Sequence, residues 1–226
     1  HCATNYGKNH NSVYDVLDAN LMFPVKLLDN SVKYGVKCFI NTDSYFNKEH
    51  LSYPYLLNYS LSKKSLLLWL EYFSKQIKVI NLRLEHIFGE DDNKDKFVAS
   101  MIDNIAVNRV KSIDLTAGEQ IRDFIYVDDV TDIYIKMLDY SKSHSFSFEL
   151  IDVGTGIPTS IKEFVQSIKD ISNSPTILNF GTLPYRENEI MYSTADLKTL
   201  EKFGLKPKYS YKDGLKKIIK ENRICN

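Results

Sequence analysis

Two short apolar runs on either side of an amphipathic stretch constrain the fold of this chain more than any other feature. Residues 36–42 (VKCFINT) and 77–84 (IKVINLRL) have the length and composition of buried strands. Residues 56–76 between them, and residues 12–34 before them, have apolar positions at helical spacing, and Pro24 favours a kink in the earlier helix. This alternation of helices and strands predicts a parallel α/β sheet with right-handed crossovers.

The second half of the chain continues with shorter elements after a turn predicted at Phe88-Gly89. We expect Asp128 or Asp129 near the start of one helix, and Thr159 or Ser160 to cap another. The expected helices are 96–107, 128–140, a segment from that cap to about Ile171, 194–203 and 211–221, and the expected strands are 112–117, 124–127 and 146–153. These elements predict a smaller lobe packed on the first half.

Charge and cysteine content exclude several classes of protein. The 226 residues carry 29 basic and 29 acidic side chains, so no broad electrostatic attraction to nucleic acid or an anionic membrane is expected. The three cysteines have no metal-ligand spacing, which favours free thiols in a reducing compartment and no metal site. Without a membrane-spanning run or a signal peptide, the sequence predicts a soluble cytoplasmic protein.

Tyr59 and Lys63 form the one Tyr-x-x-x-Lys spacing in the chain. On a helix, residues four apart share a face, and an ammonium there should lower the phenol pKa below its usual value of about 10. Such a tyrosine can exchange a proton with a sugar oxygen. With 15 tyrosines among many lysines, chance alone gives about one or two such spacings, so an ordinary surface pair is the alternative.

The end of the first predicted strand adds polar groups near this pair. Asn41-Thr42-Asp43-Ser44 closes the strand, and ligands of α/β proteins bind beside the carboxyl ends of parallel strands. A hydroxyl there could hydrogen-bond the same oxygen that Tyr59 protonates. The alternative is an ordinary strand-to-loop turn.

The order of several segments resembles the extended short-chain dehydrogenases/reductases, the NAD-dependent epimerase/dehydratase family of nucleotide-sugar enzymes. Leu82–Gly89 is similar to the family's LRxxNxYG segment, and Arg122–Val130 is close to RDFIYVDDV. The remaining matches, in chain order across essentially the whole sequence, are His1–Thr4, Asn20, Thr42, the Tyr59–Lys63 pair, Val153–Gly156 and the Arg186 segment.

The resemblance implies a fold and a division into domains. It implies a Rossmann-like parallel sheet, lacking its N-terminal part, with a smaller C-terminal α+β substrate-binding lobe. Residues 1–90 would form the C-terminal part of the NAD(P)-binding domain. Residues 91–226 would form mainly the substrate-binding lobe, with some elements returning to the first domain.

The resemblance also implies roles for individual residues. Thr42, Tyr59 and Lys63 would be catalytic, and an arginine fork would suit the diphosphate of the substrate. For the two arginines, ion pairs with nearby acidic residues are the alternative, as is a structural role for His86. The implied substrate-binding residues are Asp43, Ser44, His86, Arg122 and Arg186, and the implied ligands of NAD or NADP are Ala3, Thr4, Asn20, Tyr59 and Lys63.

Two departures from the family pattern bear on which reaction and which substrate contacts are expected. Ser44 follows Asp43 where sugar 4,6-dehydratases carry a glutamate, which disfavours dehydration. His86 stands where the family usually has asparagine. The stretch LPYRENEIMYSTADLKTLEKFGLKP resembles the branch of CDP-abequose and CDP-paratose synthases, which reduce 4-keto-6-deoxy sugars.

The family's G-x-x-G-x-x-G turn, which cradles the cofactor pyrophosphate at a helix N-terminus, has no counterpart here. Because His1-Cys2-Ala3-Thr4 is typical of the end of a buried strand, we expect that an N-terminal segment precedes this sequence. The alternative is a chain that has lost the cofactor.

These observations predict an NAD(P)-dependent 4-keto-6-deoxy sugar reductase that acts on a nucleotide-diphosphate sugar for a surface polysaccharide such as O-antigen or capsule. A nucleotide-sugar epimerase is one alternative, and a non-catalytic module that binds nucleotide sugars is another. From the family, a homodimer through the helices at 12–34 and 56–76 is expected.

Overall fold

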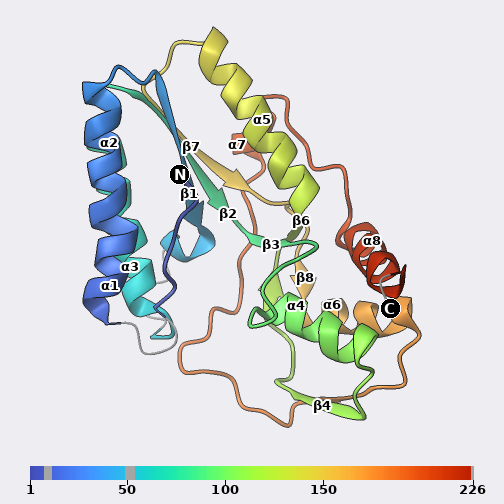
Figure 1. Ribbon diagram of the computed structural model, residues 1–226. Coiled ribbons are helices and arrows are strands. Elements are labelled where there is room, and N and C mark those ends of the chain that lie inside the picture. The colour runs from blue at the N-terminus through green and yellow to red at the C-terminus, as the bar shows by residue number, and fades with distance from the viewer. Residues whose placement is uncertain (8–11, 49–53, 225–226) are drawn as a thin grey trace. The chain divides into compact units, whose positions relative to one another are not determined.

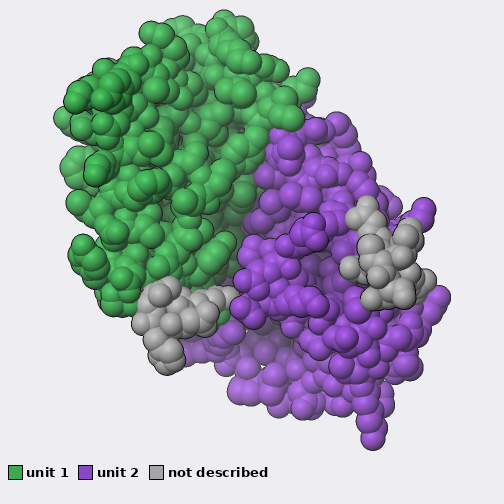
Figure 2. Space-filling view, in the orientation of Figure 1, with its two compact units in different colours: residues 1–84, 133–153 green, residues 85–132, 154–226 purple. Residues whose placement is uncertain are grey.

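The computed structural model describes residues 1–7, 12–48 and 54–224, and the chain divides into two compact units. The first unit comprises His1–Leu84 and Ile133–Val153, and the second comprises Glu85–Asp132 and Gly154–Asn226 (Figure 2). Among the described residues, the alternation of strands and helices is that of an α/β protein.

The first unit is built on a three-stranded parallel sheet (Figure 1). Its strands are β1 (Cys38–Ser44), β2 (Lys78–Leu84) and β7 (Phe148–Val153), in the order β1-β2-β7. Thr42 pairs with Leu82, and Leu82 pairs with Ile151, so the ends of the three strands coincide. The predicted parallel α/β sheet is confirmed.

Two long helical segments accompany this sheet. The first runs through α1 (Val13–Leu17), a π-helical turn (Asp18–Met22) and α2 (Phe23–Lys33), and Ser12 caps it with a capping box to Asp15. In a regular α-helix, the ring of Pro24 would clash with the carbonyl of Asn20. The wider π-helical turn contains Asn20, and the helical segment continues past the proline.

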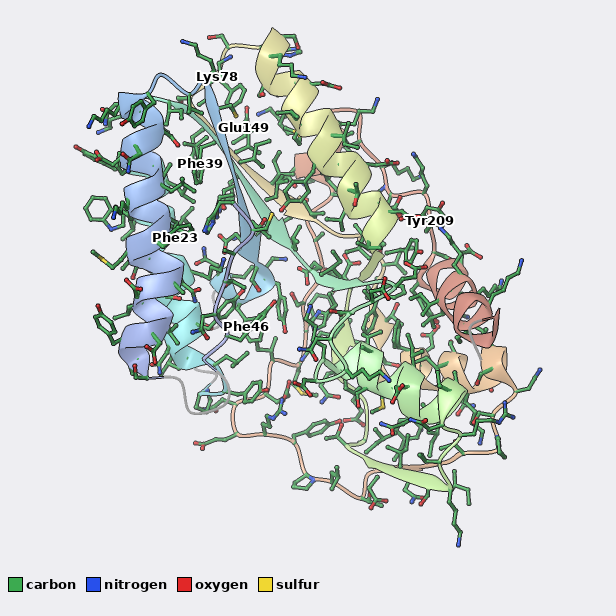
Figure 3. All side chains as sticks on the ribbon, viewed as in Figure 1. Phe23, Phe39, Phe46, Lys78, Glu149 and Tyr209 are labelled. Carbon is green, nitrogen blue, oxygen red and sulfur yellow. The ribbon has the colours of Figure 1, made fainter. Side chains whose placement is uncertain are left out.

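The second helix, α3 (Leu57–Phe73), packs its buried face with α2 and the sheet. Phe39 of β1, labelled in Figure 3, belongs to the same cluster. The buried apolar members are Leu28, Phe39, Leu66, Leu70, Phe73, Ile77 and Val79.

The start of the chain lies along β1. The main-chain nitrogen of His1 donates to Ile40 O at 2.7 Å, and Thr42 N donates to His1 O at 2.9 Å. This is the hydrogen bonding of a neighbouring strand, as predicted. However, residues 1–7 form no regular strand, and Cys2 and Ala3 are exposed rather than buried.

The described residues of the second unit form three small two-stranded sheets. β3 (His86–Phe88) pairs in parallel with β6 (Phe124–Tyr126), and β4 (Ser112–Leu115) pairs in parallel with β9 (Ile177–Phe180). β5 (Ile121–Arg122) is antiparallel to β8 (Thr159–Ser160). The helical segments of this unit are α4 (Phe97–Ile102), a π-helical turn (Asp103–Val107), α6 (Ile161–Ser172), α7 (Lys198–Glu201) and α8 (Tyr211–Ile224).

Helix α5 (Val127–Ser143) begins in the second unit and contributes its later residues to the first. The core of the second unit combines aliphatic and aromatic side chains, and the rings of Phe124 and Phe164 stack with centroids 3.7 Å apart.

Most predicted elements are present. The short strand β3 precedes the turn expected at Phe88-Gly89, and the strands β5, β8 and β9 have no counterpart in the sequence prediction. The helix expected at 194–203 is reduced to Lys198–Glu201. Its first part is held extended because the side chain of Ser193 donates to Glu85 and the main chain of Ala195 donates to Asp123.

Asp123 is a buried anchor for the loop that follows β7. Its carboxylate accepts hydrogen bonds from the main chain of Thr155 (2.8 Å), Gly156 (2.8 Å) and Ala195 (3.1 Å). Gly154 lies so close that an added Cβ would be 2.3 Å from Asp123 Oδ2. The first glycine of the Val153–Gly156 motif is therefore required by packing against this carboxylate.

Replacing Gly154 by alanine should lower the free energy of unfolding by about 2–3 kcal/mol, because the new methyl group displaces a fully hydrogen-bonded buried carboxylate. Urea unfolding followed by circular dichroism measures the loss. The control is Gly35→Ala, where a Cβ meets nothing within 4 Å and only the cost of positive φ (+69°) remains, about 1 kcal/mol. Equal losses in both variants would contradict this account.

Candidate active site

Thr42 lies near the carboxyl end of β1 and is contacted through both its main chain and its side chain. Its carbonyl oxygen accepts a hydrogen bond from Lys63 Nζ at 2.9 Å. Its hydroxyl lies 2.5 Å from the phenol oxygen of Tyr134 on α5 and 3.1 Å from Cys2 Sγ. Thr42 is therefore joined to α3 and, independently, to α5.

Lys63 is buried on α3, with 3% of its surface exposed. Burial lowers the pKa of Lys63, and the negative charge of Asp43 opposes that change. Asp43 is 4% exposed; burial raises its pKa, and the ammonium of Lys63 opposes the rise. Each group thus supplies the counter-charge that makes burial of the other tolerable.

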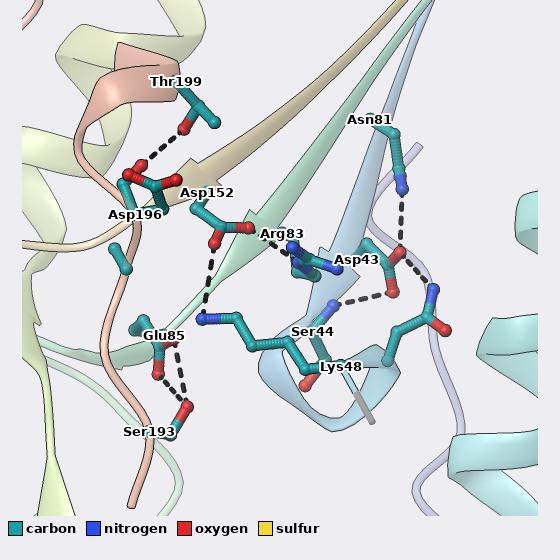
Figure 4. Close-up of polar contacts among 12 residues, drawn as sticks. Asp43, Ser44, Lys48, Asn81, Arg83, Glu85, Asp152, Ser193, Asp196 and Thr199 are labelled. Carbon is teal, nitrogen blue, oxygen red and sulfur yellow. Dashed lines mark hydrogen bonds and ion pairs between the residues drawn. The ribbon is translucent and has the colours of Figure 1, made fainter. Parts of the chain in front are cut away.

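The carboxylate of Asp43 is held by amide donors (Figure 4). Asn47 Nδ2 and Asn81 Nδ2 donate to its Oδ2 at 2.7 and 2.8 Å, and the main-chain nitrogen of Ser44 donates to its Oδ1 at 2.8 Å. Asp43, predicted as a substrate ligand, is therefore directed into the protein, where it supports Lys63.

The amide network continues along the sheet. Asn41 Nδ2 donates to Asn81 Oδ1 at 2.7 Å, and the ring of His1 contacts Asn41 Oδ1 at 3.0 Å. Asn41 and Asn81 are direct partners in the parallel register of β1 and β2. From the sequence, Asn41 was named only as part of the polar end of its strand, and Asn81 was not singled out. Each directly follows an isoleucine in a strand predicted to be buried, which was the available signal.

Tyr59 is buried on α3, with its side chain hydrogen-bonded to Ser44 and Thr4. The rings of Tyr6 and Phe46 lie 5.1 and 5.9 Å from its ring, measured between centroids. The structure therefore brings together three residues that the sequence singled out, Tyr59, Ser44 and Thr4.

The expected lowering of the Tyr59 pKa is wrong for this state of the protein. Burial raises the pKa of Tyr59 well above its ordinary value, and Tyr6 adds to the rise. Lys63 Nζ lies 5.8 Å from the centre of the Tyr59 ring, and its charge is directed toward Thr42 O and Asp43. Tyr59 is consequently a neutral phenol near pH 7, with a proton to donate.

Asn20 fixes the first residues of the chain to α3. Its Oδ1 accepts from Thr4 Oγ1 (3.1 Å) and from Asn5 N (2.7 Å), while its Nδ2 donates to Asn5 O (2.8 Å) and Ser62 Oγ (3.0 Å). Two predicted cofactor ligands, Thr4 and Asn20, are thus in direct contact, and Asn20 acts by holding the segment that carries Thr4. Ala3, another predicted cofactor ligand, directly precedes Thr4 and is exposed.

A charged group that the sequence did not predict lies at the ends of β2 and β7 (Figure 4). Arg83 Nε donates to Asp152 Oδ1 at 2.6 Å, and Lys48 Nζ lies 3.4 Å from Asp152 Oδ2. Asp152 is 4% exposed. This group joins the segment after β1 to the other two strands of the sheet.

In the second unit, Arg122 is buried at 5% exposure and paired with Glu189. Its Nη2 donates to Glu189 Oε1 at 2.9 Å, and its Nη1 donates to Ile121 O at 2.9 Å. Arg186 is exposed, and its carbonyl oxygen accepts from Glu189 N at 3.2 Å. Glu189 thereby connects the two predicted diphosphate ligands, and this carboxylate is the acidic partner of Arg122.

His86 lies beside Arg122 in the same unit. Burial lowers the pKa of His86 to about 3, and the positive charge of Arg122 contributes to the decrease. Its ring packs against Phe124 with centroids 5.7 Å apart. His86 is therefore a neutral imidazole near pH 7 and offers hydrogen bonding without charge.

The low pKa of His86 predicts a specific pH dependence of stability. An unfolded histidine takes up a proton below about pH 6.5, whereas folded His86 does so only near pH 3. Its contribution to stability is therefore complete above pH 6.5 and falls with pH, by about 2 kcal/mol at pH 5. We expect His86→Asn to remove this part of the loss.

Urea unfolding at pH 7 and pH 5 measures the effect, with His144→Asn at an exposed position as the matched control. An unchanged pH dependence in His86→Asn, relative to the natural chain, would contradict the assignment.

The parallel sheet, with a tyrosine, a lysine and a threonine hydroxyl near its carboxyl edge, defines a nicotinamide-dependent α/β enzyme. The sequence profile of the NAD dependent epimerase/dehydratase family matches residues 1–149. The chain belongs to this family, which confirms the resemblance and the expected cofactor class, NAD or NADP.

Relatives and solved structures agree with this membership. A CDP-abequose synthase from Salmonella typhimurium (strain LT2) is 38% identical over 225 residues, or 97% of this chain and 74% of that protein. A UDP-glucose 4-epimerase from Thermotoga maritima, solved with UDP-glucose, matches with a TM-score of 0.81 at 22% identity, over 95% of this chain and 72% of that one. RMD from Pseudomonas aeruginosa, complexed with NADPH, also gives 0.81, at 19% identity, over 99% and 79%.

None of the helices in the described part of the chain combines the length and apolar character needed to span a membrane.

Proposed function

We propose that the protein reduces the keto group of a nucleotide-diphosphate-linked 4-keto-6-deoxy sugar, with NADH or NADPH as reductant. The observation that carries this proposal is the site in the first unit: Lys63 is bound to Thr42 O, and a protonated Tyr59 lies on the same helix. Similarity to CDP-abequose synthases supports the substrate class. The product would serve a surface polysaccharide such as O-antigen.

The two units divide the work in this proposal. The first unit carries the residues proposed to bind the cofactor, Ala3, Thr4, Asn20, Tyr59 and Lys63. The second carries Arg122, Arg186 and His86, the proposed ligands of the sugar nucleotide. In this proposal the substrate lobe would be the second unit, and β7 and the later part of α5, which belong to the first unit, would be the elements that return.

The donor chemistry in the first unit fits a nicotinamide ribose. An ammonium has three hydrogens, and among the described residues Lys63 donates one, to Thr42 O. The remaining two hydrogens of the Lys63 ammonium would donate to ribose hydroxyls of the cofactor, near Tyr59 on the same helix. When bound, NADH or NADPH supplies the hydride for the carbonyl carbon.

The residues of this chain would bind and protonate the carbonyl oxygen of the substrate. Thr42 Oγ1–H would hydrogen-bond the carbonyl oxygen, and Tyr59 would give that oxygen its phenol proton as the bond to carbon becomes single. The resulting phenolate would regain a proton from water. The raised pKa of Tyr59 keeps the phenol protonated before the reaction, which is the state that reduction requires.

Ser44 supports reduction over dehydration. Elimination needs a base at the neighbouring sugar carbon. Ser44 instead caps the short turn after β1, accepting from Phe46 N at 3.3 Å, and hydrogen-bonds Tyr59. The position thus supports the tyrosine and supplies no carboxylate.

Substrate recognition would depend on the group around Glu189. Arg122 has donors beyond those given to Ile121 and Glu189, and Arg186 is exposed. Both would contact the diphosphate, since a planar guanidinium matches its oxygens. His86 would add a neutral polar contact to the sugar.

Cofactor stoichiometry distinguishes this function from epimerisation, which the similarity to a UDP-glucose 4-epimerase makes the second candidate. A reductase oxidises one NAD(P)H for each sugar reduced, whereas an epimerase gives no net change. Absorbance at the reduced nicotinamide band, with a CDP-linked 4-keto-6-deoxy sugar, measures this directly. Absence of net oxidation would exclude the reductase.

Tyr59→Phe should lower kcat by about 10²–10⁴-fold with little change in substrate affinity, because it removes only the transferable proton. The control is Tyr34→Phe, an exposed tyrosine that belongs neither to the proposed site nor to the proposed interface, which should retain full activity. Turnover and isothermal calorimetry with the sugar nucleotide provide the two readouts. Full activity in Tyr59→Phe would remove Tyr59 from its assigned role.

We also propose a cytoplasmic homodimer formed through α1–α2 and α3. These helices expose large apolar side chains, which usually mark an interface. Cys2 and Cys38 are free thiols, in keeping with a reducing compartment. The apolar residues concerned are Tyr14 (74% exposed), Met22 (59%), Phe23 (50%), Leu61 (45%), Leu68 (66%), Trp69 (44%) and Tyr72 (53%).

Trp69→Glu should convert the dimer to monomer, because a charge would be buried without a partner at the interface. Light scattering coupled to size-exclusion chromatography reports the mass. Leu138→Glu on α5, also an exposed apolar position, is the control and should leave the mass unchanged. A monomeric natural protein, or a dimer that survives Trp69→Glu, would contradict this interface.

A further inference from the structure

Tyr134 is a partly buried tyrosine that neither the sequence motifs nor the proposed mechanism uses. It lies on α5, 92 residues from Thr42 in sequence, and its phenol oxygen is 2.5 Å from Thr42 Oγ1. Its neighbours Ile133 and Met137 are buried at 3% and 0% exposure, so this face of α5 is fixed by packing. The contact to Thr42 is therefore built into the first unit.

The number of hydrogens on Thr42 decides the direction of this hydrogen bond. A threonine hydroxyl has one hydrogen to give and two lone pairs to accept with. In the structure, Thr42 Oγ1 donates to Cys2 Sγ at 3.1 Å. Either oxygen can donate across the Thr42–Tyr134 contact, and with the Thr42 hydrogen directed at Cys2 Sγ we assign the Tyr134 phenol as the donor.

Burial supports the same direction. It raises the pKa of Tyr134 above its ordinary value, so the phenol keeps its proton throughout the working pH range. Among the described residues, Asp43 and Cys2 are the charged or ionisable groups that oppose its ionisation.

We propose that Tyr134 is a positioning residue, whose phenol O–H donates to Thr42 Oγ1 and so directs the single Thr42 hydrogen toward the reacting oxygen of the substrate. This inference rests on the proposed function, in which Thr42 binds that oxygen. A thiol sulfur is a weak acceptor. The hydrogen bond from Thr42 to Cys2 is therefore weak, and a substrate carbonyl oxygen, which is a stronger acceptor, would displace Cys2 as the acceptor.

The hydrogen bond from Tyr134 would also make Thr42 Oγ1–H a stronger donor to the substrate. A hydroxyl that accepts one hydrogen bond donates a stronger one, because each bond polarises the next. The benefit grows as negative charge develops on the carbonyl oxygen, so it should affect kcat more than KM.

The test is Tyr134→Phe, made both in the natural chain and in a Thr42→Val background. We expect kcat to fall about five- to tenfold in the natural chain with KM nearly unchanged, which is the worth of one hydrogen bond. In the Thr42→Val background, the same change should have no further effect on the residual rate. Tyr140→Phe on the same helix, where the ring stacks on His144, is the control and should leave kcat unchanged.

Equal losses in both backgrounds, or no loss in either, would overturn the proposal. A merely structural role predicts lower thermal stability and equal losses, whereas the positioning role predicts that the effect depends on the Thr42 hydroxyl.

A second readout does not depend on turnover. In ligand-free protein with ring-labelled tyrosine, the Cζ resonance that Tyr134→Phe removes should shift in Thr42→Val and not in Cys38→Ser, a change elsewhere on β1. If no 4-keto sugar nucleotide is reduced but this shift is present, the proposed function fails and the Tyr134–Thr42 hydrogen bond stands. If reduction occurs but the shift is absent, the inference about Tyr134 fails alone.

Discussion

The contact between the Lys63 ammonium and the carbonyl oxygen of Thr42 is the interaction on which the rest of the site depends. It joins α3, which carries Tyr59, to the strand that carries Thr42 and Asp43. A buried ammonium is costly unless a counter-charge and hydrogen bonds accompany it. Asp43 supplies the charge, and Asn47 and Asn81 keep that carboxylate in place. The positions of the proposed catalytic residues are thus fixed by a buried hydrogen-bond network.

Much of the fold could be predicted from local sequence patterns. The strands at 36–42 and 77–84 and the helices at 12–34 and 56–76 have strong apolar periodicity, and the structure reproduces them within a few residues. Elements that depend on distant partners could not be predicted. Residues 194–197 have helical propensity, yet Glu85 and Asp123 hold neighbouring positions extended. β9 is short and partly exposed, so its apolar signal is weak.

The site shows the same division between local and long-range information. The spacing of Tyr59 and Lys63 could be read directly, and the resemblance supplied Thr42 and Asn20. The pKa of Tyr59 could not be deduced, because it depends on burial and on the direction of the Lys63 charge, both consequences of tertiary structure. Tyr134 was missed because it comes from a helix whose sequence pattern indicates only packing. Asp123 lies in a motif that invites a catalytic interpretation, yet its carboxylate is fully engaged by loop amides.

The paired asparagines of β1 and β2 constrain how this sequence can drift. Asn41 and Asn81 are paired in the register of neighbouring strands, and Asn41 Nδ2 donates to Asn81 Oδ1. The other end of each amide contacts His1 and Asp43, respectively. A single change to an apolar residue at either position would leave its partner buried with an unmet hydrogen bond and, through Asn81, would loosen Asp43. The route from this pair to an apolar pair therefore passes through a single change that leaves one amide unmet, and any route that removes Asn81 also withdraws a donor from Asp43. In relatives of this protein, positions 41 and 81 should therefore co-vary, with both asparagines kept or both replaced.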